Sequence, residues 1–274
     1  MENKERKEFY SLNNAEAQQT YVGVRRAKDW VGFFLPHLRK GFSVLDCGCG
    51  VGSITLDIAE LVAPGKVIGI DMDEEQLKIA RANAEKRGLT NISFEQGNVY
   101  QLRFDASSFD AALAHTLLYH LNDPLSALKE LRRVLKAGGI VAISDDDMNT
   151  ITFSPDHPIA QKLIDLMRRV VIFNGGSPFY SRNLRGLLLQ AGFARTEGFA
   201  VAAEHYGRLD ETRRMAYVMS QQLSDPVLLN LVTSQGWASP EEINEMVTWI
   251  QEWGERPDAF MAIMYCAALG WNEQ

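Results

Sequence analysis

The chain has 274 residues, enough for one large domain or two modest ones. Its 46% hydrophobic and 23% charged residues are ordinary globular usage and exclude a disordered or fibrous chain. A formal charge of −7 disfavours nucleic acid and anionic membranes as partners. The longest apolar run, 259–269, is too short to span a bilayer, and residues 1–30 carry no apolar segment typical of a signal peptide. We therefore expect a cytoplasmic protein.

The N-terminal part is expected to form a polar arm over residues 1–20 and then one amphipathic helix, Tyr21–Leu35, ended by Pro36. Together these make an N-terminal segment of residues 1–40, with the main domain over 41–274. Ser53 is expected to cap a second helix. Its inward residues would be Ile54, Ile58, Leu61 and Val62.

Strands and helices then alternate along the chain. The apolar patterns predict helices over 74–87 and from Pro124 to the Gly138-Gly139 pair. Strands are predicted at 43–47, 66–71, 92–95, 109–114 and 140–144. This alternation is typical of an α/β protein with a doubly wound, mainly parallel sheet, which binds its ligand at the carboxyl ends of the strands.

The second half is less regular. It predicts helices from Pro158 and over 181–191, strands at 197–206 and about 258–269, and two or three helices between those strands. The clearest of these has a capping box at Ser239 and Glu242. We expect the helices around 150–192 and 207–256 to form a cap over the ligand crevice, whose apolar pocket some of the aromatic residues there would line.

A glycine-rich loop, Gly48-Cys-Gly50-Val-Gly52, follows the first strand directly after Asp46, and Asp71 ends the second strand. An acid at the second strand's tip suits the hydroxyls of a ribose. Asp46 would repel a pyrophosphate, and the third glycine comes one residue too early for a nicotinamide dinucleotide site. The pattern favours a nucleoside with an amino-acid tail, S-adenosylmethionine, over a nicotinamide cofactor. An NAD-dependent oxidoreductase remains the less favoured alternative.

The ordered motifs resemble those of the class I S-adenosylmethionine-dependent methyltransferases, particularly the subgroup acting on small molecules. The resemblance rests on Val44–Gly52, Asp71-Met72, Gly97-Asn98-Val99, Phe109–His115 and Leu135–Val141. It implies a Rossmann-like sheet of seven strands ending in an antiparallel hairpin. It also implies methyl transfer by in-line displacement to an oxygen, nitrogen or carbon atom. The aromatic-rich cap and the acidic surface favour a small, partly apolar metabolite as the acceptor. A sensor or scaffold that binds the cofactor without turnover remains open, as does a homo-oligomer.

The same resemblance implies which residues bind the cofactor. Asp71 would hold the ribose, and Met72 would stack on the adenine. Asn98, where the family usually has Asp, would accept from the adenine amino group. Arg25 or Arg26 would pair with the cofactor carboxylate. The full predicted set is Tyr21, Arg26, Asp46, Gly48, Cys49, Gly50, Gly52, Asp71, Met72, Gln76, Gly97, Asn98, Val99 and His115.

Tyr119 and His120 follow the fourth strand, where the methyl group should emerge. Either is a candidate general base, although both could simply line the pocket. His205-Tyr206 is a second candidate pair.

Two groups of residues raise the question of a metal. Asp145 and Asp147 would share one face after the fifth strand, so the acidic run 145–147 suits either a magnesium site or a solvated turn. Cys47 and Cys49 lack zinc spacing and read as small loop residues. We predict no metal.

Overall fold

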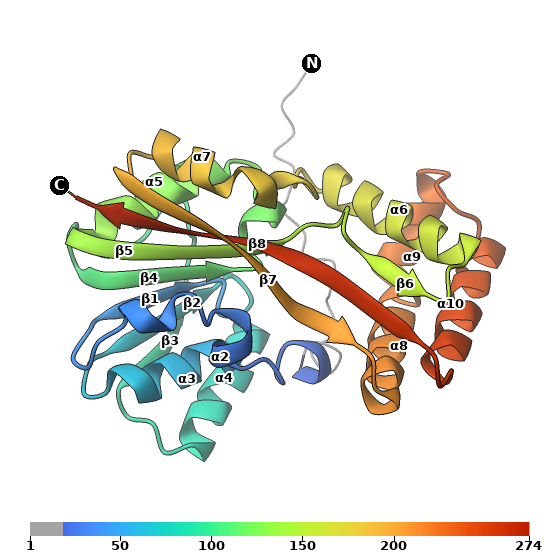
Figure 1. Ribbon diagram of the computed structural model, residues 1–274, viewed down its shortest axis with the longest axis horizontal. Helices are drawn as coiled ribbons and strands as arrows, with labels where there is room; N and C mark the ends of the chain where they lie inside the picture. Colours follow the sequence, from blue (N-terminus) through green and yellow to red (C-terminus); the bar gives the residue numbers. More distant parts are fainter. Residues whose placement is uncertain (1–18, 274) are drawn as a thin grey trace.

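The computed structural model describes residues 19–273, which form a long twisted sheet flanked by helices and continued at one end by a helical layer (Figure 1). The strands are β1 (Val44–Cys47), β2 (Val67–Asp71), β3 (Ile92–Gln96), β4 (Phe109–His115), β5 (Leu135–Asp146), β6 (Thr152–Ser154), β7 (Arg195–Tyr206) and β8 (Phe260–Asn272).

The strand order is β3-β2-β1-β4-β5-β8-β6, and β7 pairs with the other edge of β8. Strands β1 to β5 are parallel, whereas β8 runs antiparallel to β5, β6 and β7. The predicted Rossmann-like sheet with a terminal antiparallel hairpin is thereby confirmed. The short strand β6 was not predicted. It pairs with residues 260–262 of β8, beyond the point where β5 ends.

The helices are α2 (Ala27–Trp30), α3 (Ser53–Val62), α4 (Glu74–Lys86), α5 (Pro124–Val134), α6 (Pro158–Phe173), α7 (Leu184–Gln190), α8 (Leu209–Leu223), α9 (Pro226–Ser234) and α10 (Pro240–Gly254), with short 3-10 helices η1 (Leu35–His37), η2 (Leu118–His120) and η3 (Tyr180–Asn183). The predicted capping box of Ser239 with Glu242 is present. Asp123 caps α5 by accepting from the backbone N–H of Ser126. Within residues 19–273 no helix is long and apolar enough to cross a membrane.

The core has two main parts. Helices α5 and α7 pack on one face of the parallel sheet and α2 and α3 on the other. A separate apolar cluster joins α6, α8, α9 and α10 to the start of β8, with Trp253 and Ile250 at its centre. The Trp253 indole donates to the Ser154 carbonyl at 3.0 Å. Strands β7 and β8 therefore run from the sheet into the helical layer, and α7 belongs to the sheet rather than to that layer (Figure 1).

The single helix predicted over 21–35 is wrong, because the chain there is broken into short pieces. Residues 19–21 end a helical turn, Arg26 is extended, and α2 has only four residues. Gly23 packs against the Gln19 carbonyl, where an added Cβ would lie only 2.3 Å from the oxygen. Glycines and β-branched valines weaken a helix, and the break lets Arg25 turn inward, where it is 4% exposed.

Three local details of the predicted helices also differ. Ser53 does not cap α3; Gly52 is the N-cap, and the Ser53 hydroxyl donates to the Val22 carbonyl at 2.7 Å. Leu61 is 42% exposed rather than inward. Helix α5 ends at Val134, before the glycine pair, because Leu135 already pairs with Phe109 of β4.

Candidate functional site

The loop after β1 has a backbone that only glycine adopts easily. Gly48, Gly50 and Gly52 have φ of 73°, 53° and 78°. A Cβ on Gly52 would also lie 2.8 Å from the Phe94 ring. The Gly50 N–H donates to Asp71 Oδ2 at 2.9 Å, which ties the loop to the tip of β2. The loop is therefore held close to the sheet, with its backbone exposed to the space above the strand tips.

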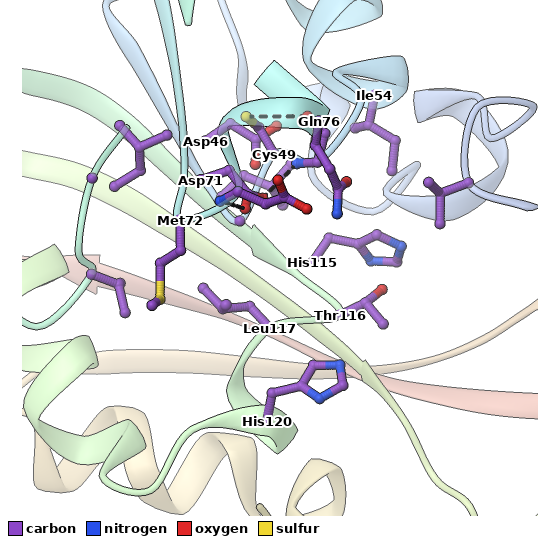
Figure 2. A pocket seen from close by; sticks show the side chains of 18 of the residues that line it. Asp46, Cys49, Ile54, Asp71, Met72, Gln76, His115, Thr116, Leu117 and His120 are labelled. Carbon is purple, nitrogen blue, oxygen red and sulfur yellow. Dashed lines mark hydrogen bonds between the residues drawn. The ribbon is translucent and has the colours of Figure 1, made fainter. Parts of the chain in front are cut away.

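That space is a cavity, here called the first cavity. Asp46, Asp71 and Gln76 lie on one side, and His115, Thr116 and His120 lie across from them (Figure 2). Of the predicted cofactor residues, the cavity brings together Asp46, Gly48, Cys49, Gly50, Asp71, Met72, Gln76, Gly97, Asn98, Val99 and His115. Tyr21, Arg26 and Gly52 do not line it.

Two carboxyl groups dominate the first cavity. Asp46 is 3% exposed and accepts from the Thr55 hydroxyl at 2.6 Å. Burial raises the pKa of Asp46 from 3.8 to about 7. Asp71 accepts from the backbone N–H groups of Gly50 and Asp73, and burial raises its pKa too. Two carboxyl groups that are costly to ionise in isolation suit a ligand with hydroxyl donors or a positive charge.

Apolar side chains line another part of the first cavity. Ile70, Val99 and Leu117 line it, together with the 60% exposed Met72. The Asn98 amide oxygen accepts from the Tyr100 N–H at 2.9 Å. The loop thus uses one of the two lone pairs that we expected Asn98 to offer to an adenine.

Arg25, and not Arg26, lines the first cavity. Its Nη1 donates to the Thr116 hydroxyl at 3.0 Å and lies 3.2 Å from His115 Nε2, and its guanidinium lies 4.0 Å above the Trp30 ring. Nε and Nη2 are buried without a partner among the described residues. Burial and the Arg25 charge hold the pKa of His115 well below its usual value, so this histidine is neutral.

Arg26 points away from the first cavity. It is half exposed and pairs with Asp57 at 3.0 Å. Asp57 Oδ2 also accepts from the backbone N–H of Ala27, at the start of α2. The broken backbone turns consecutive arginines in opposite directions, which a continuous helix would not do.

A second cavity adjoins the first at Thr116, which lines both. Thr116 has φ of 57°, a strained conformation for a β-branched residue and one that gathers at functional sites. The second cavity lies between the ends of β5, β7 and β8 and helices α6 and α8. Its apolar lining is Met148, Ile151, Met167, Val170, Val171, Met215, Val218, Met219, Met261 and Ile263.

The polar lining of the second cavity centres on Glu204, which is 3% exposed. Its Oε1 accepts from the Tyr21 hydroxyl and, at 3.0 Å, from Tyr206; its Oε2 accepts from Tyr265 at 2.5 Å. Burial and the charge of Glu204 raise the pKa of Tyr21 and Tyr265 well above the usual value, so both phenols stay protonated. Tyr21, predicted to contact the cofactor, lies here instead.

The predicted pair Tyr119 and His120 is divided between the cavities. Tyr119 lines the second cavity and His120 the first. Burial lowers the pKa of His120 to about 3, which makes it a weak base. In the second candidate pair, His205 is exposed whereas Tyr206 is buried against Glu204.

The three consecutive acids after β5 have different surroundings. Asp145 accepts from the Leu117 N–H at 2.8 Å, and Asp147 accepts from Asn149 and pairs with Arg182. Asp146, not the predicted pair Asp145 and Asp147, lines the second cavity. Within residues 19–273 no group of three or more His, Cys, Asp or Glu side chains is placed to hold a metal.

Sequence reasoning missed Asp146 and Glu204 as individual site residues. Glu204 had a usable signal, since it is an acid two residues before Tyr206 in an otherwise apolar strand end, so both belong to one face. Asp146 had no such signal, because it lies between two other aspartates and the sequence does not show which of the three faces the cavity.

Comparison with known proteins gives a consistent result. Residues 38–170 match the family described as "Methyltransferase domain". The probable methyltransferase ltbC of Aspergillus luteorubrus is 30% identical over 97% of this chain and 96% of its own. The demethylmenaquinone methyltransferase of Lactococcus lactis is 40% identical over 49% of this chain and 52% of its own. A putative methyltransferase from Bacillus halodurans shares the fold, with a TM-score of 0.59 at 19% identity over 90% of this chain and all of that one.

The match to ltbC extends over nearly the whole of both chains, the helical layer included. It confirms the prediction of an enzyme and argues against both a nicotinamide oxidoreductase and a non-enzymatic scaffold. By sequence and by fold, this chain belongs to the class I S-adenosylmethionine-dependent methyltransferases and uses S-adenosylmethionine as its methyl donor.

Proposed function

We propose that the enzyme methylates a small, largely apolar molecule held in the second cavity, with the cofactor in the first. The observation that carries this proposal is Thr116, which lines both the cavity with acids at the strand tips and the mainly apolar second cavity. Most side chains that line the second cavity are apolar. Five of them are methionines, whose flexible side chains suit an apolar ligand. The match to a demethylmenaquinone methyltransferase, over about half of each chain, is compatible with such an acceptor.

The residues that line the first cavity suit S-adenosylmethionine in their chemistry. Asp71 would take the ribose hydroxyls, Met72 and Val99 would cover the adenine, and Asp46 would face a cationic group of the ligand. The unpartnered Nε and Nη2 of Arg25 are suited to the cofactor carboxylate. The bound cofactor supplies a methyl group already activated on a sulfonium. Neutral His115 would not repel that positive charge.

The protein's own contribution is then mainly alignment. Helices α6, α8 and α10 would act as the cap that shields the acceptor from water, and Thr116 would mark the line between acceptor and methyl group. Holding two reactants in line at close range supplies much of the rate enhancement in such a displacement.

Calorimetric binding of S-adenosylmethionine, S-adenosylhomocysteine and NADH tests the cofactor part of this proposal. We expect the first two to bind and NADH not to bind. Asp71→Ala should weaken both by about ten- to a hundredfold, since a charge-assisted hydrogen-bond pair is removed. Asp156→Ala, at an exposed acid, is the matched control. Binding that is unchanged in Asp71→Ala would contradict the assignment of the ribose site.

A further inference from the structure

One carboxylate oxygen in the second cavity has no partner. Asp146, at the end of β5, is 9% exposed, and its Oδ1 is buried without a hydrogen-bond partner among the described residues. Leaving such an atom unpaired is costly. An unpaired carboxylate oxygen in a mainly apolar cavity marks a place where a ligand can donate a hydrogen bond.

The charges around Asp146 make it a good proton acceptor. Burial and the negative charge of Glu204 raise its pKa to about 7, while the Arg25 cation opposes this rise. The titratable groups that act on it come from three other parts of the fold and from its own strand end: Glu204 on β7, Tyr265 on β8, Tyr21 and Arg25 before α2, and its neighbours Asp145 and Asp147. A carboxylate with a pKa near the working pH is well matched to general-base catalysis.

Neighbouring side chains are less suited to that task. Glu204 already accepts from three phenol hydroxyls. The Tyr21 and Tyr265 hydroxyls donate hydrogen bonds to Glu204. Asp145 Oδ1 accepts a hydrogen bond from the Leu117 N–H. Asp145 Oδ2 is also unpartnered among the described residues, but Asp145 does not line the second cavity. Asp146 Oδ1 is therefore the unpartnered carboxylate oxygen of the residues that line it.

We infer that Asp146 is the general base of the methyl transfer, and that the acceptor is a mainly apolar molecule bearing a phenol or enol hydroxyl, methylated on that oxygen. This inference rests on the proposed function. In the step, the acceptor oxygen bonds to the methyl carbon as the carbon–sulfur bond breaks, and that electron pair stays on sulfur. The hydroxyl proton passes to Asp146 Oδ1 and leaves later to solvent.

A hydroxyl fits this position better than an amine does. A neutral hydroxyl donates its hydrogen bond to Asp146 and becomes a stronger nucleophile as it loses the proton. An amine beside a buried carboxylate would be held as an ammonium ion, whose lone pair is not free to attack.

The test uses full-length wild type, Asp146→Asn and Asp156→Asn with labelled S-adenosylmethionine and two probes, para-propylphenol and para-nitrophenol. Wild type should form the methyl ether of para-propylphenol. Asp146→Asn should slow that reaction by about a hundredfold or more. Asp146→Asn should slow the methylation of para-nitrophenol far less, because the hydroxyl of para-nitrophenol ionises readily without a base. Asp156→Asn should match wild type.

A binding measurement gives an independent readout. In the S-adenosylhomocysteine complex, wild type should bind para-propylphenol more tightly than its methyl ether, and Asp146→Leu, which has no acceptor oxygen, should lose that preference. Equal slowing of both phenols in Asp146→Asn would overturn the base assignment. If wild type binds S-adenosylmethionine but methylates neither phenol, the inference is overturned and the proposed function stands. Lack of S-adenosylmethionine binding would instead count against the proposed function.

Discussion

Tyr21 and Glu204 lie 183 positions apart in the sequence, yet the Tyr21 hydroxyl donates a hydrogen bond to Glu204 Oε1. The contact joins the segment before α2 to the end of β7. Because Arg25 belongs to the same segment and lines the first cavity, the positions of the two cavities depend on each other. The described part of the N-terminal segment, residues 19–40, therefore contributes to both cavities.

The two neighbouring arginines should respond differently to substitution. Arg25→Lys should weaken S-adenosylmethionine binding by about tenfold or more, because a lysine keeps the charge but loses the planar guanidinium donors. Arg26→Lys should change the affinity by less than about twofold, since Arg26 is half exposed and paired with Asp57. Calorimetry measures both affinities, and circular dichroism checks that both variants are folded. Equal effects at the two positions would show that Arg25 does not contact the cofactor.

Asp46 should make the stability of the cofactor-free protein depend on pH. Its pKa rises from 3.8 to about 7 on folding, so the folded state holds its proton more tightly than the unfolded state does. The stabilisation is complete below about pH 4 and is lost as the pH rises through about 7. Asp46→Asn cannot ionise and should therefore gain stability relative to wild type across that range, while binding the cofactor more weakly.

Urea unfolding without cofactor at about pH 5 and about pH 8 measures this difference. Asp156→Asn, at an exposed acid, is the control and should show no such trend. A stability difference between Asp46→Asn and wild type that is the same at both pH values would refute the prediction.

Gly52 and Gly88 both have a left-handed backbone, and substituting each by alanine separates the cost of backbone strain from the cost of a close contact. Gly52 has φ of 78° and would place a Cβ 2.8 Å from the Phe94 ring, whereas Gly88 has φ of 66° and open space around it. Gly88→Ala should lower the free energy of unfolding by about 1 kcal/mol through strain alone. Gly52→Ala should lower it by about 1–3 kcal/mol more, because Phe94 must also move. Equal losses in urea unfolding would mean that the contact with Phe94 carries no cost.

The prediction of the first cavity succeeded because its signals are local. Strands that run parallel bring their carboxyl ends to one edge of the sheet, so Asp46, Asp71 and His115 had to meet once the alternation of strands and helices was recognised. The glycine pattern also carried its own information, since a left-handed backbone at Gly48, Gly50 and Gly52 requires glycine at those positions.

The second cavity could not be predicted in this way. The sequence by itself determined the parallel sheet, the glycine loop and the acids at the strand tips, because each depends on short-range periodicity and backbone conformation. Only the tertiary structure decided that Arg25 rather than Arg26 turns inward, that Asp146 rather than its neighbours lines the second cavity, and that Glu204 meets three tyrosines. Those choices depend on the break in the N-terminal helix, on the antiparallel pairing of the end of β5 with β8, and on the irregular register between Val201 and Glu204 in β7. Each of these is set by packing between segments far apart in the chain.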